Sequence, residues 1–131
     1  MIIYVSGVFD ILHRGHIDLF KYAKQLDNKD NYLIVGVSKD EDVEKYKRKP
    51  VEPLSERMYK VENLKWVDKV IVAEDNRKIT NLDDYDYVVT SDEYEFKDEE
   101  IYREPKKQNK IKYFRRNENY SSTKIIEKIK G

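Results

Sequence analysis

The sequence predicts a doubly wound α/β fold, with five parallel strands in one sheet and helices on both faces. Five short apolar runs, rich in β-branched or aromatic residues, have the length and composition of strands. These runs are residues 1–6, 32–37, 66–72, 87–90 and 110–115. Strand, helix and strand follow one another within about forty residues, as in a βαβ unit with a right-handed crossover. Alternation of this kind predicts a parallel, Rossmann-like sheet.

Length and composition restrict the class of protein. The 131 residues suit one domain, residues 1–131. Lys and Arg number 26, as do Asp and Glu, so the net charge of +0 disfavours a general nucleic-acid binder. Cysteine is absent, which excludes disulfides and thiolate metal sites. No apolar run reaches the ~18 residues of a membrane span, and residues 1–6 form a strand, so we expect a cytoplasmic protein without a leader or a membrane partner.

The crossing from the first strand to the first helix carries the strongest functional signal. Gly7 ends the strand, and from Ile17 onward apolar residues recur at helical spacing. His13 and His16 stand three residues apart where this helix begins, so they share one face. A helix start presents unpaired backbone N–H groups and the positive end of the helix dipole. The pattern predicts a site for an anion, above all a phosphate chain.

The motif His-x-Gly-His, preceded by Gly-x-Phe-Asp, resembles the signature of the nucleotidylyltransferases, and in particular of the cytidylyltransferase branch. The resemblance implies that His13 and His16 stabilise charge on the α-phosphate of a nucleotide. It also implies a nucleotide-binding role for the neighbouring residues Gly7, Val8, Phe9, Asp10, Arg14 and Gly15. The alternative is that the histidines serve packing or lie on the surface.

Residues 38–52 are polar and contain the basic run 45–49. A loop at the carboxyl end of a parallel strand lies beside the ligand crevice of such a sheet. The family has basic residues here that contact the triphosphate and the acceptor phosphate. Arg48 occupies one of those positions, which implies nucleotide binding, whereas Tyr46 occupies another. Lys45 or Lys47 is therefore expected to bind the acceptor, and a solvated charge run is the alternative.

The helix that opens at Pro53 is expected to turn Met58, Val61, Leu64 and Trp66 inward. Arg57 matches a family arginine that reaches the phosphates, so we expect it to be catalytic; an ordinary helix-surface arginine is the alternative. Residues 66–72 then match the family's next strand in register. Lys78 lies in the following loop, where the family has an acceptor-binding lysine.

Residues 91–94 follow the fourth strand, where cytidylyltransferases of the glycerol-phosphate type have a glycine, two acids and a tryptophan. Asp92 and Glu93 keep the acids, and an acid can accept from the cytosine amino group. Tyr94 replaces the tryptophan and can stack on a base or wall the site. Ser91 replaces the glycine. These departures leave the identity of the base open, and a solvated acidic turn is the alternative.

The C-terminal segment resembles the second signature of the family, an arginine followed by a loop and a hydroxyl-rich helix start. The resemblance implies that Arg116 is catalytic. It also implies that the hydroxyl groups bind the nucleotide phosphates at a helix start. These hydroxyl residues are Ser121, Ser122 and Thr123. A plain serine N-cap is the alternative.

The resemblance covers nearly the whole chain and implies transfer of a cytidylyl group from CTP to a small phosphorylated alcohol. Glycerol 3-phosphate is the first candidate, giving CDP-glycerol for teichoic acids or other surface polymers. The family also implies a homodimer and Mg²⁺ carried on the triphosphate. An adenylyltransferase of the sugar-phosphate or FAD-forming kind is the first alternative, because residues 49–57 resemble those enzymes equally. A non-catalytic nucleotide-binding module is the second.

Overall fold

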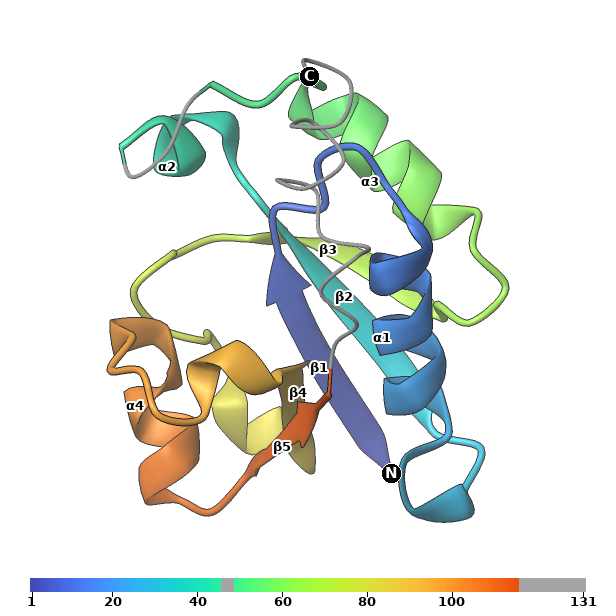
Figure 1. Ribbon diagram of the computed structural model, residues 1–131, viewed down its shortest axis with the longest axis vertical. Helices are drawn as coiled ribbons and strands as arrows, with labels where there is room; N and C mark the ends of the chain where they lie inside the picture. Colours follow the sequence, from blue (N-terminus) through green and yellow to red (C-terminus); the bar gives the residue numbers. More distant parts are fainter. Residues whose placement is uncertain (46–48, 116–131) are drawn as a thin grey trace.

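The computed structural model describes residues 1–45 and 49–115, which form one five-stranded sheet with all strands parallel (Figure 1). The spatial order is β3-β2-β1-β4-β5. The expected fold class is therefore confirmed. The strands are β1 (Ile2–Gly7), β2 (Tyr32–Ser38), β3 (Lys69–Ala73), β4 (Tyr87–Ser91) and β5 (Ile111–Phe114).

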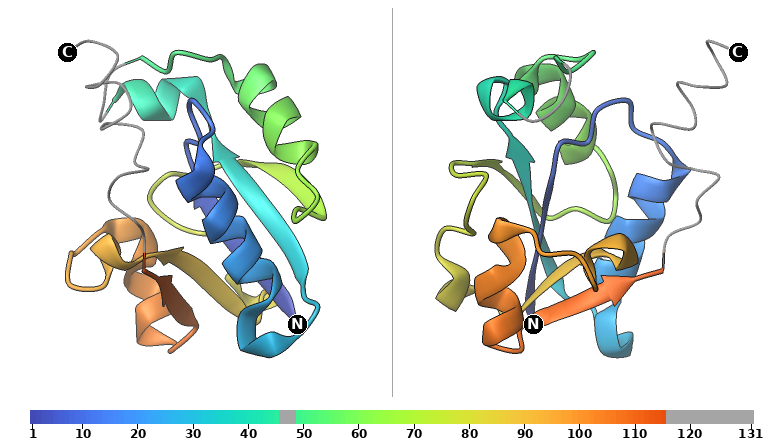
Figure 2. Two further views of the ribbon diagram at one scale, coloured as in Figure 1. Left: turned by 45° about the vertical axis from the view of Figure 1, so that its right-hand side comes forward. Right: turned by 60° about the vertical axis from the view of Figure 1, so that its left-hand side comes forward.

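Helices cover both faces of the sheet (Figure 2). Helices α1 and α3 pack on one face, and α4 and η2 on the other. No described helix is both long and apolar enough to span a bilayer. The helical segments are α1 (Arg14–Lys24), η1 (Leu26–Asn28), α2 (Asp40–Glu44), α3 (Leu54–Glu62), η2 (Leu82–Asp84), η3 (Asp92–Tyr94) and α4 (Glu100–Lys107).

Two elements differ from the expectation. Helix α2 lies in the segment that was expected to be a loop. The sequence did not predict this helix because five residues with one apolar side chain carry no detectable helical period. Helix α3 ends at Glu62 and β3 begins only at Lys69. Leu64 and Trp66 therefore lie beyond the helix, although both still pack against the core as expected.

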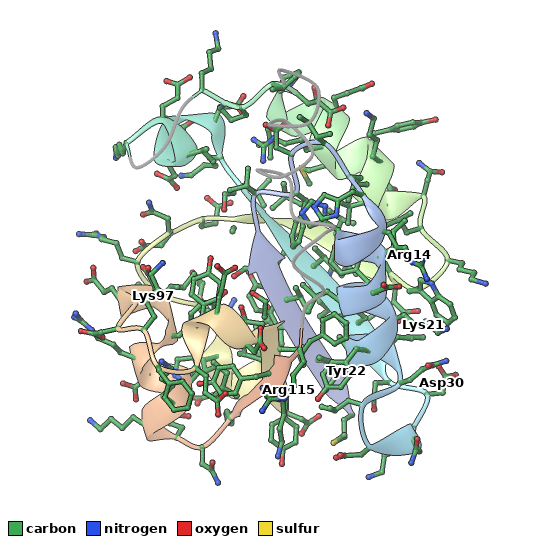
Figure 3. All side chains as sticks on the ribbon, viewed as in Figure 1. Arg14, Lys21, Tyr22, Asp30, Lys97 and Arg115 are labelled. Carbon is green, nitrogen blue, oxygen red and sulfur yellow. The ribbon has the colours of Figure 1, made fainter. Side chains whose placement is uncertain are left out.

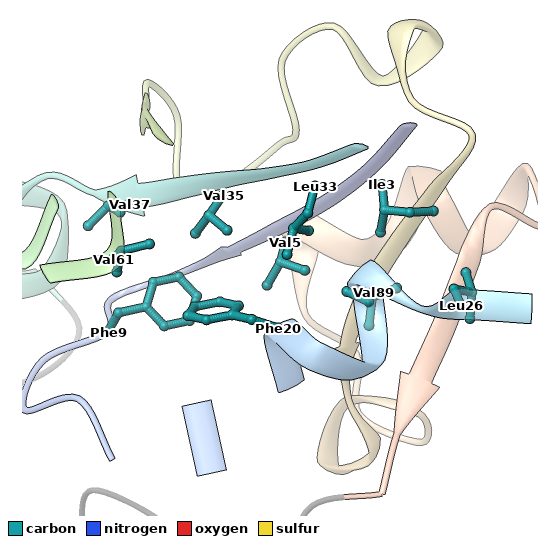
Figure 4. Packing of buried hydrophobic residues seen from close by; sticks show 11 residues of the cluster. Ile3, Val5, Phe9, Phe20, Leu26, Leu33, Val35, Val37, Val61 and Val89 are labelled. Atoms are coloured by element: carbon teal, nitrogen blue, oxygen red, sulfur yellow. The ribbon is translucent and has the colours of Figure 1, made fainter. Parts of the chain in front are cut away.

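The core has two layers because successive strand residues point to opposite faces. Ile3 and Val5 are fully buried under α1, together with Phe20 of that helix (Figure 4). Tyr4 points to the other face and stacks on Tyr85 with ring centroids 4.6 Å apart. Side chains on each face of the sheet thus pack against the helices on that face and fix their positions.

The sheet opens between β1 and β4. Strand β1 pairs with β2 along its whole length, from Ile2 to Gly7. It pairs with β4 only at Ile3 and Tyr4. The two strands therefore diverge toward their carboxyl ends, at the point where the strand order reverses. In open α/β sheets this is the place where ligands bind.

Candidate active site

The turn after β1 is tightly folded. Phe9 and Ile11 have positive φ angles of 54° and 53°. The ring of Phe9 lies over Gly7, where a Cβ atom would come within 2.8 Å of the ring. A side chain at position 7 would therefore displace the Phe9 ring, and the turn directs the chain into α1.

The two histidines cap the helix that follows the turn. The Nδ1 atom of His13 accepts from the Gly15 N–H at 3.0 Å, and the Nδ1 atom of His16 accepts from the His13 N–H at 3.3 Å. A ring nitrogen that accepts a hydrogen bond carries no proton. Each neutral imidazole therefore has its proton on Nε2, which makes Nε2–H the donor of both rings.

The imidazole rings are held by packing as well. Their centroids are 3.9 Å apart, and Phe9 meets His16 edge to face at 5.5 Å. Phe9 in turn contacts Phe20 of α1 at 5.0 Å (Figure 4). The capping bonds and these ring contacts hold the histidine pair at one orientation, which is the arrangement that a preorganised donor pair requires.

Asp10 joins the turn to the segment before α3. Its carboxylate accepts from the N–H groups of Val51 at 2.8 Å and Glu52 at 3.0 Å. The Glu52 carboxylate accepts in return from the Ile11 N–H at 3.0 Å and pairs with Lys60. The hydrogen bond to Glu52 raises the pKa of the Lys60 ammonium.

Arg57 is fully buried beneath the turn. Its guanidinium donates to the Val8, Ser38 and Glu52 carbonyls at 2.8, 2.9 and 3.0 Å, and it pairs with Asp40. One side chain thus connects the ends of β1 and β2 to the start of α3. In the structure this side chain holds the loops together; its expected catalytic role stays a prediction.

The segment after β4 lies at the same edge of the sheet. Asp92 forms an ion pair with Arg115 at 3.7 Å, and the Ser91 hydroxyl donates to Glu93 at 3.1 Å. The ring of Tyr94 lies 5.2 Å from that of Tyr102, a buried residue of α4. Asp92, Glu93 and Tyr94 follow the carboxyl end of β4, the strand on one side of the opening; their expected contacts with the base stay predictions.

Tyr102 lies below the opening between β1 and β4. The Thr90 hydroxyl donates to the Tyr102 oxygen at 3.0 Å, and Ser6 of β1 also bonds to Tyr102. Burial raises the pKa of this phenol. A cavity of about 220 Å³ lies at the same edge, lined by residues that include Val8, Ser38, Asp42, Arg77, Glu99 and Glu100.

Comparison with known proteins identifies the family. Residues 4–128 match the family described as cytidylyltransferase-like. The chain belongs to this family. It is 35% identical to the glycerol-3-phosphate cytidylyltransferase of Bacillus subtilis, covering 95% of this chain and 94% of that protein.

Other relatives of the cytidylyltransferase-like family carry different names. The FAD synthase of Methanothermus fervidus is 33% identical over 95% of this chain and 92% of that protein. The ethanolamine-phosphate cytidylyltransferase of Arabidopsis thaliana is 35% identical over 97% of this chain, but the chain spans only 32% of that protein. Among solved structures, the lipopolysaccharide core biosynthesis protein of Thermoplasma volcanium has a TM-score of 0.68 and 25% identity, covering 90% of this chain and 98% of that chain.

The remaining predicted site residues are spread more widely. Arg14 lies at the outer side of α1, 70% exposed, and forms an ion pair with Asp18 at 3.8 Å (Figure 3). Lys45 follows α2 and is paired with Asp42 at 4.0 Å, and Lys78 is exposed in the loop after β3. The other candidates lie outside the described residues: Lys47, Arg48, Arg116, Ser121, Ser122 and Thr123.

Sequence reasoning missed three side chains that build the site. Glu52 and Asp40 lie in the polar segment that was predicted as loop, and Tyr102 lies in a charged stretch. No local period or motif marks them. Their partners are distant in sequence, so only the folded chain reveals their roles.

Proposed function

We propose that this protein transfers a cytidylyl group from CTP to a small phosphorylated alcohol and releases pyrophosphate. Glycerol 3-phosphate is the first candidate acceptor. The observation that supports the proposal is the histidine pair: two packed imidazoles whose donors are Nε2–H groups, at a helix start beside the opening of the sheet. The relationship to the Bacillus subtilis cytidylyltransferase, over nearly the full length of both chains, agrees with it.

The reaction needs positioning and charge stabilisation rather than a covalent enzyme intermediate. An oxygen of the acceptor phosphate attacks the α-phosphorus of CTP and forms a new P–O bond. The bond from that phosphorus to the bridging oxygen of the β-phosphate breaks, and the electron pair leaves with pyrophosphate. Negative charge grows on the α-phosphate oxygens in between. His13 and His16 would donate hydrogen bonds to those oxygens, and donors fixed in advance stabilise such a transition state most.

In the proposed reaction, Mg²⁺ would enter the site bound to the phosphate oxygens of the triphosphate. Mg²⁺ binds through phosphate oxygens and water with one or two carboxylates at most. Within residues 1–45 and 49–115, no three acidic or histidine side chains gather into a metal site. The ion would neutralise phosphate charge when bound.

The acceptor would lie along the carboxyl edge of β1 and β2. Lys45 and Lys78 come from the loops after β2 and β3, and the cavity beside Val8 separates these loops from α4. We propose that Lys45, Lys47 and Lys78 attract the acceptor phosphate. A homodimer and a cytoplasmic location complete the proposal, both on the strength of the family resemblance.

Adenylyl transfer is the competing function. The FAD synthase of Methanothermus fervidus is about as similar to this chain as the Bacillus subtilis cytidylyltransferase is, at 33% and 35% identity. Residues 49–57 also resemble the adenylyltransferases as much as they resemble the cytidylyltransferases. On the proposal, Asp92 and Glu93 accept from the amino group of cytosine; because adenine carries an amino group as well, the preference for CTP would rest on where that group lies relative to the carboxylates. Selectivity between the two nucleotides therefore separates the branches.

The test is a panel of CTP, ATP, GTP and UTP with glycerol 3-phosphate, ethanolamine phosphate and FMN, with pyrophosphate release as the readout. We expect turnover with CTP and one of the phosphorylated alcohols. Turnover with ATP and FMN moves the protein to the adenylyl branch. Nucleotide binding without pyrophosphate release from any pair supports the non-catalytic module.

A further inference from the structure

Glu52 connects the turn before His13 to helix α3. Its Oε1 accepts from the Ile11 N–H at 3.0 Å, and its Oε2 pairs with Lys60. The Glu52 side chain is only 14% exposed. A carboxylate so largely removed from water, with a partner on each oxygen, holds a defined position.

Ile11 is the residue that Glu52 holds, and its backbone is strained. The φ angle of 53° places a β-branched residue in the left-handed region, where its side chain crowds the backbone. Ile11 stands two residues before His13, the N-cap of α1. Its backbone angle therefore helps to set the direction in which the chain enters the helix that carries both histidines.

The connection closes in both directions. The Asp10 carboxylate accepts from the N–H of Glu52, while the Glu52 carboxylate accepts from the N–H of Ile11. Each segment thus holds the backbone of the other through a side chain. Strained backbone of this kind persists only where the surroundings determine it, and it clusters at active sites.

We propose that Glu52 is a positioning residue, which fixes Ile11 and thereby the placement of His13 and His16. Glu52 does not touch the reacting atoms in this account; it acts through the backbone of the turn. The kinetic readout of the proposal rests on the proposed function, whereas its structural readout does not.

The key variant is Glu52→Met, which keeps the length of the side chain but replaces the carboxylate with a thioether, a much weaker acceptor. We expect kcat to fall by on the order of ten- to a hundredfold, as for reacting groups displaced by a fraction of an ångström, with little change in the KM for CTP. Glu56→Met makes the same chemical change at an exposed position of α3 and should leave kcat unchanged. Glu52→Gln retains an acceptor oxygen and should restore most of the turnover.

The histidines offer a readout that needs no activity. The sequence contains 2 histidines, both in the site, so ¹⁵N-histidine labelling of the untagged chain yields signals from these two rings alone. Nitrogen shifts report which ring atom carries the proton. We expect Glu52→Met to move these signals away from the Nε2–H pattern, and Glu52→Gln and Glu56→Met to leave them in place.

The outcomes are separable. A folded Glu52→Met protein with unchanged imidazole signals overturns the proposal, even if kcat falls, because Glu52 would then act by another route. Unchanged kcat overturns it as well. If the parent protein turns over no substrate pair, the proposed function fails, and the imidazole signals alone decide the positioning role. If Glu52→Met does not fold, Glu52→Asp decides in its place: its shorter arm should give an intermediate displacement of the signals, and unmoved signals overturn the proposal.

Discussion

The turn between β1 and α1 and the segment after β4 lie at the same edge of the sheet, but their polar groups are held differently. In the turn, the carboxylate of Asp10 and the guanidinium of Arg57 are buried and bonded to backbone groups of distant segments. After β4, Asp92 pairs with Arg115, whose side chain is 83% exposed, and Glu93 is itself exposed.

This contrast separates two tasks of the proposed reaction. Groups that stabilise developing charge work best when their orientation is fixed beforehand, since nothing must reorganise as the charge grows. Groups that distinguish one base from another gain only a modest binding difference, and they can adjust when the nucleotide arrives. The structure therefore favours a rigid phosphate side and an adjustable base side.

The largest effect is expected at the rigid side, from Arg57→Met. The change leaves three partly buried carbonyl groups and the Asp40 carboxylate, which is 39% exposed, without their shared donor. A polar group left unsatisfied away from water typically costs about 1–3 kcal/mol in the free energy of unfolding, and several such groups lose their donor together, so we expect the largest loss of stability here, which chemical denaturation measures.

Arg103→Met is the matched control, because it removes an arginine whose pair with Asp98 at 2.9 Å is solvent-exposed. Its loss should be small, since water screens exposed pairs. Equal losses of unfolding free energy in the two variants would contradict the view that the buried contacts of Arg57 stabilise the turn.

The second prediction concerns the chemistry itself. His16→Gln keeps an acceptor at the third helical position, where glutamine can complete a capping box, so the fold should survive. Turnover should fall by on the order of a hundredfold to a thousandfold, because one donor to the α-phosphate is lost. His13→Ala should act likewise.

Steady-state kinetics and circular dichroism on the purified variants decide the second prediction, with CTP affinity measured separately. Charge grows in the transition state, so kcat should fall far more than affinity. A folded His16→Gln protein with near-normal turnover would remove the catalytic role and leave a phosphate-binding turn.

The same contrast explains what the sequence could predict. The Gly-x-Phe-Asp and His-x-Gly-His motifs are contiguous, so local spacing already placed both histidines at a helix start. The strands were found because β-branched runs carry their own signal. Helix α2 carries too little period to detect, and the buried contacts of Arg57 and Glu52 join segments up to 49 residues apart, which no local pattern encodes.

The third prediction tests the adjustable side. Asp92→Asn and Glu93→Gln should each lower the preference for CTP over ATP by about five- to 150-fold, since one good base contact contributes about 1–3 kcal/mol of discrimination. Competition kinetics with both nucleotides measures this ratio. Asp98→Asn, an exposed acid before α4, is the control and should leave the ratio unchanged. An unaltered ratio in both test variants would place base recognition elsewhere in the chain.

The smallest effect is expected from Tyr102→Phe, which removes the buried Tyr102 hydroxyl beneath the adjustable side. The ring contact with Tyr94 remains, but the hydrogen bonds with Thr90 and Ser6 are lost, at a combined cost of about 1–2 kcal/mol near neutral pH. Burial raises the pKa of the Tyr102 phenol in the folded protein. The phenol therefore ionises first in the unfolded chain, and the stability that it contributes is complete below about pH 10 and lost as pH rises through the folded pKa. The free energy of unfolding, measured between neutral and alkaline pH, should fall less steeply above about pH 10 in the variant, because one ionisable group is gone. Some decrease should remain, because burial also raises the pKa values of Tyr4 and Tyr85. Tyr59→Phe, at a position that is 63% exposed, should match the parent at every pH; a Tyr102→Phe profile parallel to the parent's would show that Tyr102 is not anchored in the way the structure indicates.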